Sequence, residues 1–268
     1  MHLSDDERNH HHGLQQDLRV LAKRTDRREL LRWMAFTSLV PIIGCGGTDS
    51  SGGSGDTSGC AKIPEETAGP YPGDGSNGAN ALVLSGIVRG DIRSSIAGAS
   101  GVAAGIPLTI TLTLVASDDS CTPLRGYAIY LWHCDQAGRY SMYSSGVTSE
   151  NYLRGVQVTD EEGKVTFTSI FPACYSGRWP HIHFEIYPSV EATSSSRNKV
   201  ATSQLALPED SCDAVYATSG YSQSVRNLGQ VSLSSDNVFS DGASTQLATV
   251  TGNTTDGYAA SLVVGIQV

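Results

Sequence analysis

Two histidines stand one residue apart in a chain that contains only seven. They are His181 and His183, within "CYSGRWPHIHFEIY", residues 174–187. In a β-strand, residues i and i+2 project from the same face, so a strand here would aim both imidazoles one way. Histidine is the commonest side-chain metal ligand. The pair therefore suggests a metal site, although two polar surface histidines on one strand would produce the same pattern.

Two tyrosines change the balance between these interpretations. Tyr175 precedes His181 across the loop-like stretch "SGRWP", and Tyr140 follows a strand-like segment that ends "LWHCDQAG". Phenolate is a hard, anionic oxygen donor, so two phenols with two imidazoles fit ferric iron better than zinc or blue copper. Glu185 is in phase with the histidines, which leaves a two-histidine-one-carboxylate ferrous site as a rival. Glu185 could instead accept a hydrogen bond from a metal ligand or lie on the surface as a solvated carboxylate.

The sequence around these side chains has the pattern of β-strands separated by turns. The clearest alternation runs through 107–116, where Leu108, Ile110, Leu112 and Leu114 are spaced by two. A tight turn is expected at "DEEGK", and helix-like character only within 205–228. The pattern predicts an all-β fold, a β-sandwich of mixed or antiparallel strands with long loops and little helix. The strands are expected at 81–88, 107–116, 126–135, 152–160, 164–170 and 181–187, with further strand-like pattern in the last 40 or so residues.

Three motifs in order resemble the intradiol ring-cleavage dioxygenases, the family of protocatechuate 3,4-dioxygenase and catechol 1,2-dioxygenase. They are W-x-x-D-x-x-G-x-Y, T-D-x-x-G and R-x-x-H-I-H-F, and the lead-in "ETAGPYPGDG" also looks like the family's. The resemblance covers roughly residues 60–190 and is to the exported branch. It implies a mononuclear, non-haem Fe(III) held by Tyr140, Tyr175, His181, His183 and a solvent hydroxide.

The same resemblance implies an activity: both atoms of O2 enter between the hydroxyl-bearing carbons of a catechol-type aromatic, giving a cis,cis-muconate-type diacid. Tyr175 would leave the metal and accept a substrate proton, and Arg178 would stabilise the negative charge that develops. Tyr143 and Trp179 would line the aromatic pocket, or else belong to the core. The alternative is a non-catalytic exported β-sandwich that keeps the scaffold as a binding module. Which catechol fits is left open.

The charge balance bears on partners. The formal charge is −9, and the body of the chain contains no cluster of Lys and Arg, so a nucleic acid partner is excluded. The expected partners are a small aromatic diol and O2. Because family members commonly associate, the resemblance also suggests a homo-oligomer.

The first 45 residues are typical of an export signal. Arg27 and Arg28 precede a short apolar run from Trp33 to Ile43, too short to span a bilayer, and "IIGC" resembles a bacterial lipobox with Cys45 as the acylated residue. We expect a twin-arginine-like signal and a periplasmic, cell-envelope or extracellular lipoprotein, anchored to the membrane through Cys45 or simply cleaved. A buried apolar helix is the competing interpretation.

The rest of the chain divides by composition. Residues 46–59 are a Gly/Ser-rich linker, and 60–268 are expected to form one catalytic β-sandwich domain with a C-terminal extension at 205–268. In an oxidising compartment, two disulfides and one free thiol are expected, with the pairing left open. The cysteines concerned are Cys60, Cys121, Cys134, Cys174 and Cys212. Asp135, Asp160 and His133 are expected to be structural.

Overall fold

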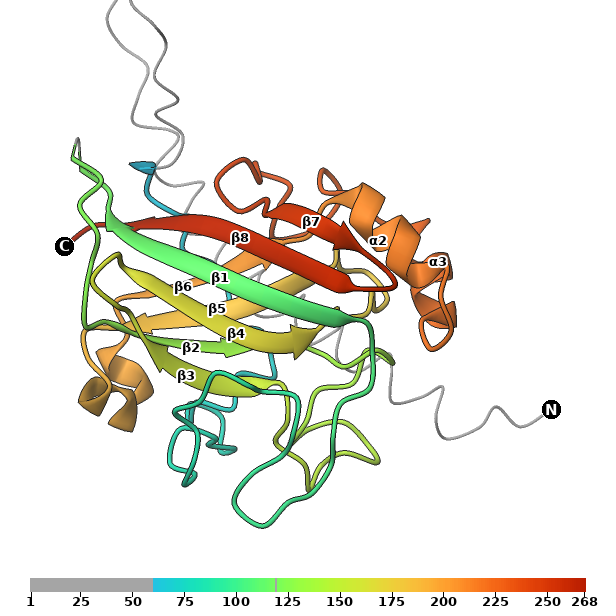
Figure 1. Ribbon diagram of the computed structural model, residues 1–268, viewed down its shortest axis with the longest axis horizontal. Helices are drawn as coiled ribbons and strands as arrows, with labels where there is room; N and C mark the ends of the chain where they lie inside the picture. The colour runs from blue at the N-terminus through green and yellow to red at the C-terminus, as the bar shows by residue number, and fades with distance from the viewer. Residues whose placement is uncertain (1–59, 119) are drawn as a thin grey trace, which may run out of the picture. The chain divides into compact units, whose positions relative to one another are not determined.

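Two four-stranded sheets make up the framework of the computed structural model, which describes residues 60–118 and 120–268. The expected export signal at 1–45, its Cys45 and the linker at 46–59 lie outside the described residues. The sheets stack as two layers, with two helices at one end (Figure 1). The elements are β1 Pro107–Ala116, β2 Ala128–Trp132, β3 Arg154–Val158, β4 Lys164–Ile170, β5 His181–Tyr187, η2 Glu191–Ser194, η3 Ser196–Asn198, β6 Ala201–Ala206, α2 Glu209–Tyr216, α3 Ser222–Leu228, β7 Thr249–Asn253 and β8 Gly257–Ile266.

The strand order of the first sheet is β4-β1-β8-β7, and that of the second is β3-β2-β5-β6. Neighbours are antiparallel except β1 and β8, which run parallel with Leu108 opposite Tyr258. The expectation of an all-β sandwich of mixed strands is therefore confirmed. No helix in the described part of the chain is long and apolar enough to cross a membrane.

The core lies between the two sheets and follows the alternation of the strands. Leu108, Ile110, Leu112 and Leu114 of β1 are buried, whereas Thr109 between them is exposed. The second sheet contributes apolar side chains from the even-numbered positions of β5: Ile182, Phe184 and Ile186. Burial of such side chains supplies the main favourable free energy of folding.

The expected turn at "DEEGK" forms, with Gly163 at a φ of +72°. The Oδ1 atom of Asp160 accepts hydrogen bonds from the backbone N–H groups of Glu162 and Lys164 at 3.1 and 2.7 Å, so this carboxylate holds the turn. The strands on either side, β3 and β4, belong to different sheets. The turn is therefore a corner between the layers and not a hairpin.

Two strand expectations need correction. Residues 81–88, expected to be a strand, form turns with one isolated bridge at Val88, and Gly86 has a φ of +90°. Their apolar residues do not share one buried face: Leu82 and Ile87 are buried, while Val83 is 68% exposed. Conversely, β6 was not expected. Its "ATSQLA" is buried on both faces and has no apolar period for a sequence pattern to detect.

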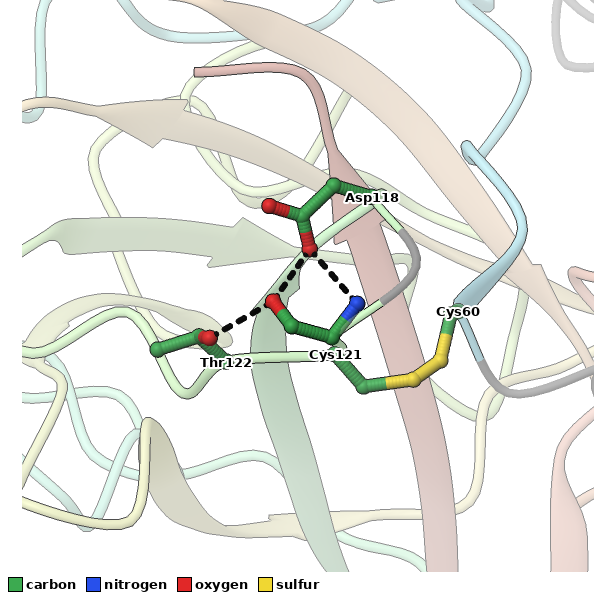
Figure 2. Close-up of a disulfide and its surroundings, with 5 residues drawn as sticks. Cys60, Asp118, Cys121 and Thr122 are labelled. Carbon is green, nitrogen blue, oxygen red and sulfur yellow. Dashed lines mark hydrogen bonds between the residues drawn. A yellow bond between two sulfur atoms is a disulfide. The ribbon is translucent and has the colours of Figure 1, made fainter.

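One disulfide, between Cys60 and Cys121, fastens the start of the described chain to the β1–β2 connection, close to Asp118 (Figure 2). The expectation of two disulfides is wrong for the described residues, because Cys134, Cys174 and Cys212 are buried free thiols. Burial raises the pKa of the Cys174 thiol to about 12, which keeps it protonated and unreactive.

Candidate active site

The outer face of the second sheet carries an unusually polar row of side chains. Because β5 alternates, His181, His183, Glu185 and Tyr187 face away from the core that receives Ile182 and its neighbours. All four are nevertheless buried, because loops cover this face. The strand thus holds two imidazoles in fixed positions under a cover built from other parts of the chain.

Four side chains converge on one point above β5. The Nε2 atoms of His181 and His183 are 3.1 Å apart, and the Tyr175 hydroxyl lies 3.1 Å from His181 Nε2. The Tyr140 hydroxyl lies 3.5 Å from the same nitrogen. Tyr140 comes from the loop after β2 and Tyr175 from the loop before β5. The structure therefore brings together the four residues that the sequence analysis selected.

The protonation of His181 makes this convergence informative. Its Nδ1 faces the carbonyl oxygen of Trp179, which places the proton on Nδ1 and the lone pair on Nε2. Burial, then the positive charge of Arg178, lowers the pKa of His181, so its imidazole is neutral. One lone pair cannot serve three neighbours, whereas a cation between them could use a donor atom from each.

The distances between the donor atoms suit a metal ion. Two ligand atoms each about 2.1 Å from one ion lie about 3.0–3.4 Å apart at angles between square and tetrahedral. Two of the observed separations, both 3.1 Å, fall within this range, and the third, 3.5 Å, lies just above it. Two imidazoles and two phenols also match the donor preference of ferric iron. The four residues fit such an ion by both distance and chemistry.

The two phenols differ in environment. Tyr140 is buried, and burial, followed by the neighbouring Tyr175, raises its pKa well above the ordinary value. The charge of Arg178 acts in the opposite direction. A nearby cation would be needed to ionise Tyr140 at neutral pH. Tyr175 is only half-buried and lies on the exposed side of the site, beside the exposed Ser176 and Gly177.

Glu185 does not join the histidines. Its carboxylate accepts hydrogen bonds from Lys199 Nζ at 2.7 Å and from the Tyr187 hydroxyl at 2.8 Å. Burial raises its pKa to about 7, against the opposing charge of Lys199. Within residues 60–118 and 120–268, no three His, Cys, Asp or Glu side chains are grouped to hold a metal. The two-histidine-one-carboxylate interpretation is therefore wrong, and so is the description of Glu185 as a surface carboxylate.

Arg178 is buried beside the four convergent side chains. Its Nε donates to Asp236 Oδ2 at 2.9 Å, and its Nη2 donates to Gln204 Oε1 at 2.7 Å. The ion pair of Arg178 with Asp236 is not a surface pair, because both side chains are under 4% exposed. Burial is the main cause of the lowered pKa values of His181 and His183 and of the raised pKa of Tyr140, and the positive charge of Arg178 contributes a smaller lowering in each case.

The two residues expected to line the pocket have different positions. Tyr143 is half-buried, and its hydroxyl accepts a hydrogen bond from the Gly73 N–H at 2.8 Å. Trp179 instead packs in the core between the sheets, and its Nε1 donates to the Leu207 carbonyl at 2.9 Å. The core role left open for Trp179 is thus the observed one.

Sequence reasoning missed the aromatic side chains that surround the site. The Tyr71 ring lies 5.0 Å from that of Tyr140 and 5.2 Å from that of Tyr143. Trp132 stacks on His183 with its ring centroid 4.9 Å away and an interplanar angle of 3°. This stacking fixes the ring plane of His183, whose Nδ1 has no hydrogen-bond partner among the described residues. "GPYPGDG" before the first strand was the available signal for Tyr71.

A buried arginine holds this aromatic wall in place. Arg154, at the start of β3, donates Nη2 to the carbonyls of Tyr71 and Ser141 at 3.0 Å each. Its Nη1 donates to the Pro72 carbonyl at 2.8 Å and to the Tyr130 hydroxyl at 3.0 Å. Arg154 therefore ties the lead-in segment, the loop that carries Tyr140 and the sheet to one another.

Asp135 and His133 were expected to be structural and have structural contacts, as Asp160 has in the turn between β3 and β4. Asp135 pairs with Arg139 at 2.8 Å and accepts the Tyr152 hydroxyl at 3.0 Å, which closes the turn before Tyr140. His133 is buried, with Nε2 2.7 Å from the Ser169 hydroxyl and Nδ1 2.8 Å from the Cys134 carbonyl. Its ring nitrogens are both engaged away from the four convergent side chains.

Comparison with known proteins agrees with this geometry. A protein-family model described as "Dioxygenase" matches residues 93–227. An intradiol ring-cleavage dioxygenase from Tetranychus urticae is similar in structure, with a TM-score of 0.61 and 26% identity, covering 78% of this chain and 95% of that one. The fold and the site thus define a class, the ring-cleavage dioxygenases with a β-sandwich scaffold.

Curated relatives match over shorter stretches. A chlorocatechol 1,2-dioxygenase of Rhodococcus opacus is 40% identical over 58 residues, which are 22% of this chain and 23% of that protein. A catechol 1,2-dioxygenase of Candida albicans is 36% identical over 59 residues, or 20% of its length. The matched stretches span about a quarter of these relatives or less. The chain belongs to the intradiol ring-cleavage dioxygenase family.

Proposed function

We propose that this protein is a ferric intradiol dioxygenase that inserts both atoms of O2 between the hydroxyl-bearing carbons of a catechol-type aromatic, giving a cis,cis-muconate-type diacid. The observation that carries the proposal is the convergence of Tyr140, Tyr175, His181 and His183 within 3.1–3.5 Å. Relatives named as catechol and chlorocatechol 1,2-dioxygenases support the substrate class.

Each side chain has a distinct role in this proposal. Tyr140, His181 and His183 are buried and would remain as ligands, while half-buried Tyr175 would leave as a phenolate and accept a proton from the incoming diol at its phenolate oxygen, becoming a neutral phenol. Ferric iron held by these residues would supply a Lewis acid that binds the diol and activates its ring towards O2. The neutral imidazoles offer lone pairs without needing to lose a proton.

Arg178 supplies a permanent positive charge next to the site. A preorganised cation stabilises negative charge that develops on the substrate, and burial strengthens the effect because little water screens it. The rings of Tyr71 and Tyr143, inclined to each other by 54°, provide an aromatic wall beside Tyr140 that an aromatic diol can contact.

Colour and oxygen uptake test the proposal together. The purified protein should be reddish from tyrosinate-to-Fe(III) charge transfer, with about one iron per chain and a visible band that shifts when catechol is added. Oxygen uptake should be measured with catechol, protocatechuate, hydroxyquinol and chlorocatechols. Tyr140→Phe should lose the colour and the activity. A colourless protein with stoichiometric iron would overturn the ligand set, and a coloured protein without uptake on any diol would favour the binding-module alternative.

Arg178→Ala should lower turnover and leave the iron content close to that of the wild type. If this variant released iron with no separate effect on turnover, the electrostatic role of Arg178 would be wrong.

We also propose that the chain is exported and anchored through Cys45, because the lipobox-like "IIGC" follows paired arginines. Membrane association should be abolished by Cys45→Ala. A fully soluble wild-type protein whose processing is insensitive to globomycin would refute the lipid anchor.

A further inference from the structure

Asp236 is a fully buried carboxylate that the family motifs do not include. It lies between α3 and β7, beyond residues 93–227 that match the family model. Its exposed fraction is 0%, which for an aspartate requires that its charge be compensated by specific partners. Those partners connect the C-terminal part of the chain to the candidate active site.

Both oxygens of Asp236 are used. Oδ2 accepts from Arg178 Nε at 2.9 Å and from the Trp179 backbone N–H at 2.7 Å. Oδ1 accepts from the backbone N–H groups of Val238 and Phe239 at 2.8 and 3.2 Å. In every one of these four contacts the carboxylate of Asp236 accepts. The surroundings of Asp236 therefore require an acceptor at both Oδ1 and Oδ2, which only an ionised carboxylate supplies.

The two Oδ2 contacts act on consecutive residues with different duties. The first fixes the guanidinium of Arg178, which Gln204 Oε1 holds from a second direction at 2.7 Å. The second fixes the backbone of Trp179, whose carbonyl faces Nδ1 of His181. One carboxylate thus contacts both the cation beside the site and the backbone N–H of the next residue, and only the cation carries a charge that can act on a reacting group.

We propose that Asp236 is a positioning residue that acts through Arg178, and that the C-terminal segment thereby completes the active site. The inference rests on the proposed function, since it assigns Asp236 to that reaction. An arginine side chain has several rotatable bonds, and a charge stabilises a reacting group only if it is held in place beforehand. Asp236 removes that freedom by gripping the guanidinium at Nε, the end nearest the backbone.

The test uses Asp236→Asn in the full-length, iron-loaded protein. Asparagine has nearly the shape of aspartate but only one acceptor oxygen, so its NH2 group must face either Arg178 and Trp179 or the two backbone donors. We expect kcat per bound iron to fall by about 10-fold or more, because small displacements of a positioned group have large effects. KM and iron content should stay within about twofold of the wild type.

A double-mutant cycle separates positioning from general destabilisation. If Asp236 acts through Arg178, adding Asp236→Asn to Arg178→Ala should lower kcat per iron by less than about twofold more. Tyr221→Phe is the matched control, since it removes buried hydrogen bonds to Phe171 and Ile106 in the core away from the site. It should lower the Tm and leave kcat per iron unchanged.

A second readout needs no turnover. In the iron-free protein, the Nε–H signal of Arg178, assigned through its loss in Arg178→Ala, should exchange with solvent at least about 10-fold faster in Asp236→Asn. If the wild type cleaves a diol but Asp236→Asn leaves kcat per iron unchanged, the inference about Asp236 is wrong and the proposed function stands. The same holds if Asp236→Asn lowers kcat as much in the Arg178→Ala background as it does in the wild type. If the wild type cleaves no diol, the proposed function fails, and the exchange rate still decides whether Asp236 fixes Arg178.

Discussion

Replacing Arg154 by methionine should loosen the aromatic wall of the site and lower stability measurably. The side chain is 1% exposed, and its hydrogen-bond acceptors are carbonyl and hydroxyl oxygens rather than carboxylates. Methionine fills similar space without any donor. The carbonyls of Tyr71 and Ser141 would each lose the donor Nη2, at about 1–3 kcal/mol for a buried acceptor.

The expected loss is smaller than the sum of those costs, because the wild type must also desolvate a guanidinium and methionine need not. We therefore expect about 2–4 kcal/mol, which for a domain of this size is a fall in Tm of at least about 4 °C. Thermal unfolding followed by circular dichroism measures this. Because Arg154 holds the Tyr71 segment, KM for a catechol should rise while iron content stays constant.

Arg125→Met is the matched control for this prediction. Arg125 is 68% exposed and pairs with Glu161 at 2.6 Å, and an exposed pair contributes only about 0–1 kcal/mol. A Tm of Arg154→Met within about 2 °C of the wild type, or a control that loses as much, would refute the reasoning that the buried hydrogen bonds of Arg154 stabilise the wall.

Three further outcomes are expected. Burial lowers the pKa of His133 to about 4, so the neutral imidazole contributes its full share to the free energy of unfolding above pH 6.5. About 3 kcal/mol of that free energy is lost as the pH falls from 6.5 to 4, because the unfolded chain takes up a proton there and the folded one does not. Urea unfolding of His133→Gln should therefore show a shallower pH dependence between pH 6.5 and 4. Cys121→Ser opens the link to Cys60, whose sequence separation is 61, and should cost up to about 4 kcal/mol, measured by unfolding with and without reductant. Leu112→Ala creates a core cavity and should cost about 2–5 kcal/mol, with iron content per folded chain unchanged.

The sequence predicted those strands whose two faces differ. The ranges of β1, β4 and β5 were predicted to the residue, because apolar side chains alternate with threonines or histidines along them. β6 was missed because small and polar residues such as Ser203 and Gln204 are buried on it without an apolar period. Residues 81–88 were mispredicted because glycine at 86 permits a turn that their composition does not reveal.

The four convergent side chains were predictable for a different reason. His181 and His183 are set by the period of one strand, and the motif spacing around Tyr140 and Tyr175 is local. The support around them is not local. Asp236 meets Arg178 only because the chain returns after α3, and Arg154 meets Tyr71 only through the packing of a loop on β3. A single sequence contains no period or motif that records such contacts.

The parallel pairing of β1 with β8 has a consequence for the synthesis of the protein. Leu108 faces Tyr258, so this edge of β1 stays open until β8 has been made. Pairings between distant segments form slowly, and an unpaired strand can associate with other chains while it waits. A truncation before β8 would leave that edge permanently open, and we expect such a fragment to aggregate. Folding of this domain therefore has to wait until β8 has been synthesised, and a nascent chain would benefit from a chaperone until then.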